Sequence, residues 1–164
     1  MLVPDRDFLL HRFDETRIKI EELLPEIDPQ KEIYPGWTIR DLLAHMTGWD
    51  DATIDSLRSH VAEHPPTVPT IRSLDEYNTL TVSSRKDLDY DRILKEWRLT
   101  RQVLRTIIEQ LPEGKFVSPV IVPWGEKVSV TYLVDMFHAH EDEHVQEIHA
   151  WLKNPVMPLK KEGN

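Results

Sequence analysis

The amino-acid sequence predicts an all-α protein built as a four-helix bundle, on three observations. Four long segments carry apolar residues at helical spacing, with charged residues between them. Prolines stand at the ends of these segments, where helices stop, and Gly114 follows Pro112 at the end of the third. The long connection between the second and third segments indicates an order of helix directions other than simple up-down-up-down.

The first predicted helix spans residues 5–24, and Leu9, Phe13 and Ile20 share one of its faces before Pro25 ends it. The second spans residues 37–60. Its start has a pattern similar to a capping box, with Thr38 followed three residues later by Asp41, and the prolines of "HPPTVP" stop it.

The third and fourth helices are predicted over residues 90–111 and 130–152. A short helix capped by Ser73 and Glu76 is expected within the long connection that precedes the third. Two β-rich pieces flank "PWGE" before the fourth helix, so a short irregular or hairpin loop is expected there. We find no internal repeat or long linker, which predicts a single domain over residues 1–164.

Composition excludes several classes of function. The chain has no cysteine, which rules out disulfides, thiolate ligands and cysteine nucleophiles. Its net charge of −9 argues against nucleic acid as a partner. No run approaches the roughly 18 apolar residues of a membrane span, and the N-terminus lacks the pattern of a signal peptide. A cytoplasmic protein without a membrane or nucleic-acid partner is therefore expected.

The run "HAHEDEH" in the fourth predicted helix separates into two faces. His140 and His144 are four residues apart, among the apolar positions, and so are expected to point into the bundle. His138 is roughly 160° away from His140 around the helix axis. We expect His138 and the carboxylates of Glu141, Asp142 and Glu143 to face solvent.

A third inward histidine turns this pair into a candidate metal site. His45 lies between Leu42 and Trp49 on the buried face of the second helix. One buried histidine is commonly a core residue with a hydrogen-bond partner, whereas three converging imidazoles suit Zn²⁺, Ni²⁺ or Fe²⁺. Three protein ligands also leave coordination positions open, as in catalytic rather than structural sites.

Two carboxylates near these histidines are candidates for catalytic or ligand-orienting roles. Glu147 follows His144 by three residues and could act as a general base, and Asp41 precedes His45 by one helical turn and could orient its ring. The remaining histidines, His11, His60, His64 and His149, are expected at the surface or at a helix end.

Three stretches resemble the DinB-like superfamily of four-helix-bundle proteins. They are "GWTIRDLLAHMTGWDD", "LDEYNTLTV" and "FHAHEDEHVQEIHAWL", and the likeness extends over nearly the whole chain. The resemblance implies an up-down-down-up bundle, frequent homodimers, and a divalent Ni, Zn or Fe ion held by His45, His140 and His144. Tyr77 and Asn78 match a position in the second stretch to which we assign no role.

The resemblance leaves the activity open. Some relatives are transferases or isomerases that use mycothiol, bacillithiol or glutathione, which favours a metal-dependent enzyme acting on a small molecule, either thiol-dependent or hydrolytic. The alternatives are a non-catalytic protein that binds or sequesters a ligand, and a self-protection protein of the branch that opens a cyclopropane ring.

Overall fold

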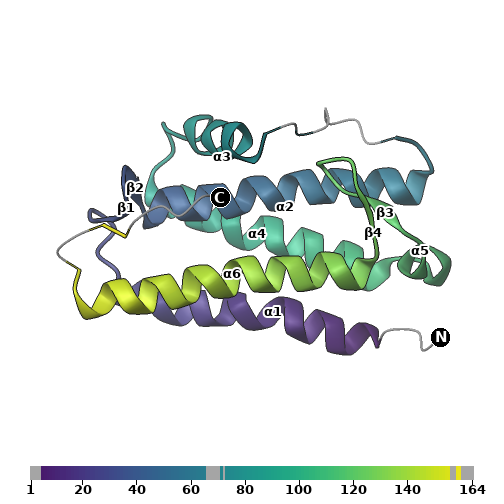
Figure 1. Ribbon diagram of the computed structural model, residues 1–164, viewed down its shortest axis with the longest axis horizontal. Helices are drawn as coiled ribbons and strands as arrows, with labels where there is room; N and C mark the ends of the chain where they lie inside the picture. Colours follow the sequence, from purple (N-terminus) through teal and green to yellow (C-terminus); the bar gives the residue numbers. More distant parts are fainter. Residues whose placement is uncertain (1–4, 66–70, 72, 156–157, 160–164) are drawn as a thin grey trace.

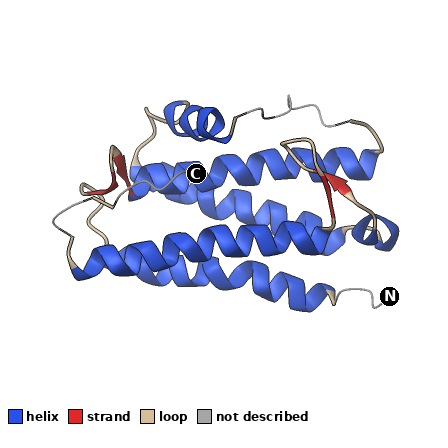
Figure 2. Cartoon of the chain, in the orientation of Figure 1, coloured by secondary structure: helices blue, strands red, loops and turns tan. Residues whose placement is uncertain are grey.

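Four long helices form the body of the protein, which we describe from a computed structural model over residues 5–65, 71, 73–155 and 158–159. The predicted all-α class is confirmed, with only two short pairs of strands among these residues (Figure 2). The four long helices are α1 (Arg6–Leu23), α2 (Ile39–Ala62), α4 (Tyr90–Gln110) and α6 (Val130–Lys153) (Figure 1).

Shorter elements connect the long helices. In chain order they are η1 (Leu24–Glu26), β1 (Glu32–Tyr34), β2 (Trp37–Thr38), α3 (Leu74–Ser83), α5 (Glu113–Val117), β3 (Val120–Ile121) and β4 (Lys127–Val128).

None of the described helices has an apolar stretch long enough to cross a membrane.

Two apolar clusters fill the bundle and show how the helices run. One cluster joins the C-terminal halves of α1 and α6 with the N-terminal halves of α2 and α4. The other joins the opposite halves of the same four helices. Helices α1 and α6 therefore run in one direction and α2 and α4 in the other, as can be followed in Figure 1. Along the chain the directions are up, down, down, up.

Side-chain caps fix the starts of the helices, as the sequence predicts. The carboxylate of Asp41 accepts hydrogen bonds from the backbone N–H of Thr38 at 3.0 Å and from its hydroxyl at 3.2 Å. The hydroxyl of Ser73 accepts from the backbone N–H of Glu76 at 3.2 Å, which confirms the short helix α3. Each cap satisfies backbone or side-chain donors that a helix start leaves without intrahelical partners.

The two strand pairs are antiparallel hairpins at opposite ends of the bundle (Figure 2). The β3–β4 hairpin confirms the loop expected before α6. The β1–β2 hairpin was not predicted, although its turn has a clear signal in Pro35-Gly36. Gly36 has φ +77°, the left-handed conformation that the third residue of a type II turn requires. Residues of this hairpin contact His45 and His144.

Candidate metal centre

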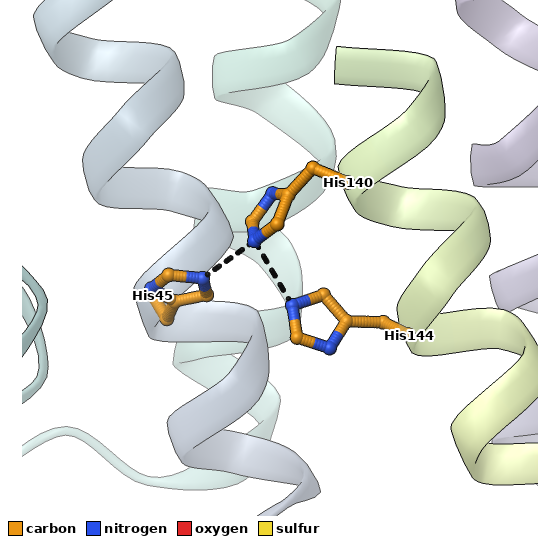
Figure 3. Close-up of side chains that lie close together, drawn as sticks. All are labelled: His45, His140 and His144. Carbon is orange, nitrogen blue, oxygen red and sulfur yellow. Dashed lines mark hydrogen bonds between the residues drawn. The ribbon is translucent and has the colours of Figure 1, made fainter. Parts of the chain in front are cut away.

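Helices α2 and α6 bring the three predicted histidines together inside the bundle (Figure 3). The Nε2 atom of His140 lies 3.3 Å from Nε2 of His45 and 3.1 Å from Nε2 of His144. One ligand atom from each ring falls within 4.8 Å of the others, and no other described group of histidines and carboxylates meets this criterion. The three histidines that helical periodicity places on inward faces therefore do converge.

The cluster is shielded from solvent. The exposed fractions are 1% for His45 and 7% for His144, and His140 is partly buried. Burial, together with the proximity of His144, lowers the pKa of His140 to about 4. At neutral pH the imidazole of His140 is therefore uncharged, which is the form that binds a metal ion.

The spacing of the ring nitrogens fits a divalent transition-metal ion. Ligands 2.0–2.1 Å from a tetrahedral Zn²⁺ ion are separated from one another by about 3.3 Å. The two Nε2–Nε2 distances of 3.1 and 3.3 Å fall close to this value. Three imidazoles are also a donor set that Zn²⁺, Ni²⁺ and Fe²⁺ accept. The residues present thus form a cluster that could hold such an ion.

The unpredicted β1–β2 hairpin supplies two aromatic neighbours of the cluster. The ring of Trp37 lies against the ring of His45, with 5.4 Å between centroids. The hydroxyl of Tyr34 lies 2.8 Å from Nδ1 of His144 and donates a hydrogen bond to the carboxylate of Glu147. Neither residue was predicted at the site, because both lie outside the helices whose periodicity indicates the inward positions.

The two carboxylate candidates have different surroundings. Glu147 lies beside the cluster, 3.6 Å from Nδ1 of His144. Burial alone would raise the pKa of Glu147, but the nearby His144 and the hydrogen bond from Tyr34 outweigh it and the pKa is lowered. Both carboxylate oxygens of Asp41 interact at the start of α2, with Thr38 and with Arg40. The catalytic or orienting roles of these carboxylates remain predictions.

A cavity of about 590 Å³ opens beside the histidines. Its size is in the range of pockets that bind small molecules. The described residues around it are mainly aromatic and aliphatic, with Asn78 and Glu126 as polar exceptions besides the histidines. They are His45, Trp49, Ile71, Leu74, Asn78, Trp124, Glu126, Tyr132, Met136, Phe137 and His140.

Tyr77 and Asn78 attach α3 to α2 around Trp49, a wall of this cavity. The indole N–H of Trp49 donates to the side-chain oxygen of Asn78 at 2.8 Å. The hydroxyl of Tyr77 donates to the backbone carbonyl of Gly48 at 2.6 Å, and the centroids of the Tyr77 and Trp49 rings are 4.8 Å apart. These contacts give the two residues a structural place beside the site.

The prediction that Glu141 faces solvent is wrong. Its exposed fraction is 1%, and it belongs to a buried network with one charged residue from each long helix: Arg17, Asp50, Arg101 and Glu141. Arg17 bridges the two carboxylates at 2.9 and 3.0 Å, and Arg101 also contacts both. The sequence offered no local signal for this, because the partners come from distant parts of the chain.

Charge balance makes this burial tolerable. Two guanidinium groups offset two carboxylates, and the hydroxyl of Thr16 donates a further hydrogen bond to Glu141 at 2.6 Å. Burial would raise the pKa of Glu141, but Arg101 and Arg17 reverse the effect and hold it at about 2. The carboxylate therefore stays ionised in the middle of the bundle.

The other histidines lie outside the cluster. His11, His64 and His149 are exposed, as expected. His60, near the end of α2, interacts with the carbonyl of Lys115 at 2.9 Å. His138 was expected to face solvent, but it is partly buried and its Nε2 lies 3.0 Å from the carboxylate of Glu15.

Comparison with known families agrees with this architecture. The model of the DinB superfamily matches residues 8–148, and the chain therefore belongs to that superfamily. A crystal structure of an uncharacterised protein from Escherichia coli UTI89 has a similar fold, with a TM-score of 0.74 and 17% sequence identity. The similarity covers 96% of this chain and 98% of that one. No curated protein matches the chain.

Proposed function

We propose that this protein is an enzyme that uses a divalent metal ion, held by His45, His140 and His144, to act on a small molecule. One observation carries the proposal: the histidine cluster is at the wall of an apolar cavity. His45 and His140 belong both to the cluster and to the cavity lining. A molecule bound in the cavity would therefore lie against the proposed metal ligands.

The histidines would bind the metal ion, and the cavity wall would bind the substrate. The three imidazoles would hold Zn²⁺, Ni²⁺ or Fe²⁺ and leave coordination positions open, because a chain with three ligands does not complete the shell. A bound divalent ion would supply Lewis acidity, which lowers the pKa of a thiol or water and favours its deprotonation. The tryptophan-rich wall would hold an apolar part of the substrate and exclude bulk water.

The reaction class that suits this arrangement is attack by a small thiol or by water on an electrophilic carbon of the substrate. A C–S or C–O bond would form, the bond from that carbon to its leaving group would break, and the proton of the thiol or water would pass to a base. The protein has no cysteine that could itself provide the thiol. In the thiol-dependent form of the reaction, a low-molecular-weight thiol would therefore have to enter the cavity as a co-substrate. The carboxylate of Glu147 lies 3.6 Å from Nδ1 of His144 and is the candidate to accept that proton.

Metal analysis provides the first test. Protein prepared without a histidine tag, and supplemented in turn with Zn²⁺, Ni²⁺ and Fe²⁺ under reducing conditions, is expected to retain about one equivalent of metal. His140→Ala should lose it, whereas His149→Ala, an exposed histidine of the same helix, should not. Wild-type protein that stays metal-free after supplementation would contradict the proposal.

A reaction screen provides the second test. Metal-loaded protein is mixed with a panel of small thiols and apolar electrophiles, and consumption of thiol and electrophile is followed by mass spectrometry. Turnover by wild type and its loss in His140→Ala are expected. Equal rates in the two proteins would remove the mechanism, and stoichiometric ligand binding without turnover would favour a sequestering protein instead.

A further inference from the structure

The hydroxyl of Tyr34 connects a proposed metal ligand to a carboxylate. It lies 2.8 Å from Nδ1 of His144 and donates its hydrogen to Glu147, which comes one helical turn later on α6. Tyr34 is 4% exposed, which limits the access of water to its hydroxyl. Tyr34 is not on a helix but on β1, just before the turn of the hairpin.

Counting hydrogens determines the tautomer of His144. A phenol has one hydrogen to donate, and an ionised carboxylate can only accept. Because the hydrogen of Tyr34 goes to Glu147, the contact with His144 requires Nδ1 to carry the hydrogen and donate it to the phenol oxygen. In neutral His144 the lone pair is then on Nε2, the nitrogen 3.1 Å from His140 inside the cluster.

The hairpin that carries Tyr34 is anchored by contacts of its other residues. Ile33 is fully buried, and its carbonyl accepts a hydrogen bond from the backbone N–H of Leu159 at 2.6 Å. Trp37, on the second strand, lies against the ring of His45. The same hairpin thus contacts a histidine of α2 and a histidine of α6.

We propose that Tyr34 is a positioning residue of the metal centre, which together with Glu147 keeps His144 in the Nδ1–H tautomer with Nε2 available to the cation. This inference rests on the proposed function, since it assumes that a metal ion is the ligand of the cluster. Loss of a group that orients a metal-binding histidine typically weakens metal affinity about 10–100-fold. A loss of that size is expected when the Tyr34 hydroxyl is removed.

The first experiment measures the dissociation constant for Zn²⁺ by competition with a chromophoric chelator. Tyr34→Phe deletes the hydroxyl and keeps the ring, and should bind Zn²⁺ about 10–100-fold more weakly than wild type. Tyr90→Phe, at a partly buried tyrosine of α4, is the matched control and should bind as wild type does. Unchanged affinity in Tyr34→Phe would overturn the role of Tyr34 and leave the proposed function standing.

The second experiment reads the tautomer directly, in metal-free protein, from the ¹⁵N chemical shifts of the His144 ring. Wild type is expected to show a protonated Nδ1. In Glu147→Ala the phenol is free to donate to Nδ1, which should move the hydrogen of His144 to Nε2 and weaken Zn²⁺ binding. Glu147→Gln keeps an oxygen that accepts from Tyr34 and should restore the Nδ1–H form.

The two experiments separate the possible failures. A wild-type protein that binds no cation would overturn the proposed function, and the role of Tyr34 toward the cation with it. The positioning role alone would be overturned by either of two results in a wild-type protein that does bind Zn²⁺. One is a hydrogen on Nε2 of His144 in the metal-free protein, and the other is an unchanged tautomer in metal-free Glu147→Ala. The Glu147 variants also serve if Tyr34→Phe does not fold.

Discussion

His140 and Glu141 are adjacent on α6, yet they belong to two separate buried polar groups. Nε2 of His140 lies 3.1 Å from Nε2 of His144 in the candidate metal centre. The carboxylate of Glu141 is held by two arginines, with Nε of Arg17 at 3.0 Å. Consecutive residues are 100° apart around a helix, so α6 buries two neighbouring faces, one polar group on each.

The buried charge network is expected to be essential for stability. Glu141→Gln removes one of two negative charges and leaves Arg17 and Arg101 to share Asp50. Breaking a buried ion pair on one side typically costs about 3–5 kcal/mol. Urea denaturation of metal-free protein should show a loss of that size in the free energy of unfolding. Glu143→Gln, two residues away and exposed, should change little, and equal effects would contradict this account.

Glu141 also predicts how the protein responds to acid. Its pKa is about 2 in the folded protein against an ordinary value of 4.5, so the stability that it contributes is complete above pH 4.5. That contribution should disappear progressively as the pH falls from 4.5 toward 2. In Glu141→Gln, the free energy of unfolding should depend less on pH in this window. An unchanged slope would mean that Glu141 does not titrate with folding.

His140 predicts a second pH window, at higher pH. Burial, followed by the influence of His144, lowers the pKa of His140 from 6.5 to about 4. The unfolded chain therefore takes up a proton at higher pH than the folded one, and metal-free protein should lose stability as the pH falls from 6.5 toward 4.

The measurement is urea denaturation at several pH values with a chelator present. His140→Gln has no proton to take up at this position, so its free energy of unfolding should fall less steeply between pH 6.5 and 4. His149→Gln, at an exposed histidine, should retain the wild-type slope. Identical slopes in wild type and His140→Gln would show that His140 does not contribute to this dependence.

Helical periodicity was sufficient to find the candidate ligands, because each of them lies among apolar residues of its own helix. His45 is between Leu42 and Met46 on the buried face of α2, and all three residues are at most 2% exposed. The capping residues were equally readable, because a cap depends on a partner three residues away. Both kinds of signal are local in sequence.

Glu141 and Tyr34 could not be found in this way, because what buries them is distant in sequence. Glu141 pairs with Arg17, 124 positions earlier, and the hydroxyl of Tyr34 meets His144, 110 positions later. Glu141 is followed by Asp142 and Glu143, and three consecutive carboxylates are typical of a solvated helix surface. Only the arrangement of the four helices shows that Glu141 is buried. Pro35-Gly36 is a turn signal for the hairpin, but helical periodicity carries no information about it.

Gly48 is expected to be required for the contact between α2 and α3. A Cβ at this position would lie 2.2 Å from Cγ2 of Thr81, far inside van der Waals contact. Gly48→Ala should therefore lower the free energy of unfolding by roughly 1–3 kcal/mol, although alanine is otherwise the better helix former. Thermal denaturation would measure the change. Gly114→Ala, where a Cβ meets nothing within 4 Å, should not be destabilising, and similar losses in both would contradict the close-contact explanation.

Tyr77 is expected to act in the structure beside the cavity and not in the chemistry. Burial, with a further contribution from Asp51, raises the pKa of its hydroxyl to about 12, so at neutral pH the group can donate a hydrogen bond but cannot serve as a base. The hydrogen goes to the carbonyl of Gly48 at 2.6 Å. Tyr77→Phe should lower the free energy of unfolding by about 1 kcal/mol, the usual net value of one hydrogen bond.

The same variant separates this structural role from a catalytic one. The contacts of Tyr77 are with Trp49 and Gly48, and the candidate metal ligands are other residues. Tyr77→Phe should therefore bind Zn²⁺ with wild-type affinity. Thermal denaturation and chelator competition on one preparation provide both numbers. Any turnover found in the reaction screen should persist in Tyr77→Phe to within a few-fold. A variant with wild-type stability and metal affinity but no turnover would place the Tyr77 hydroxyl in the reaction.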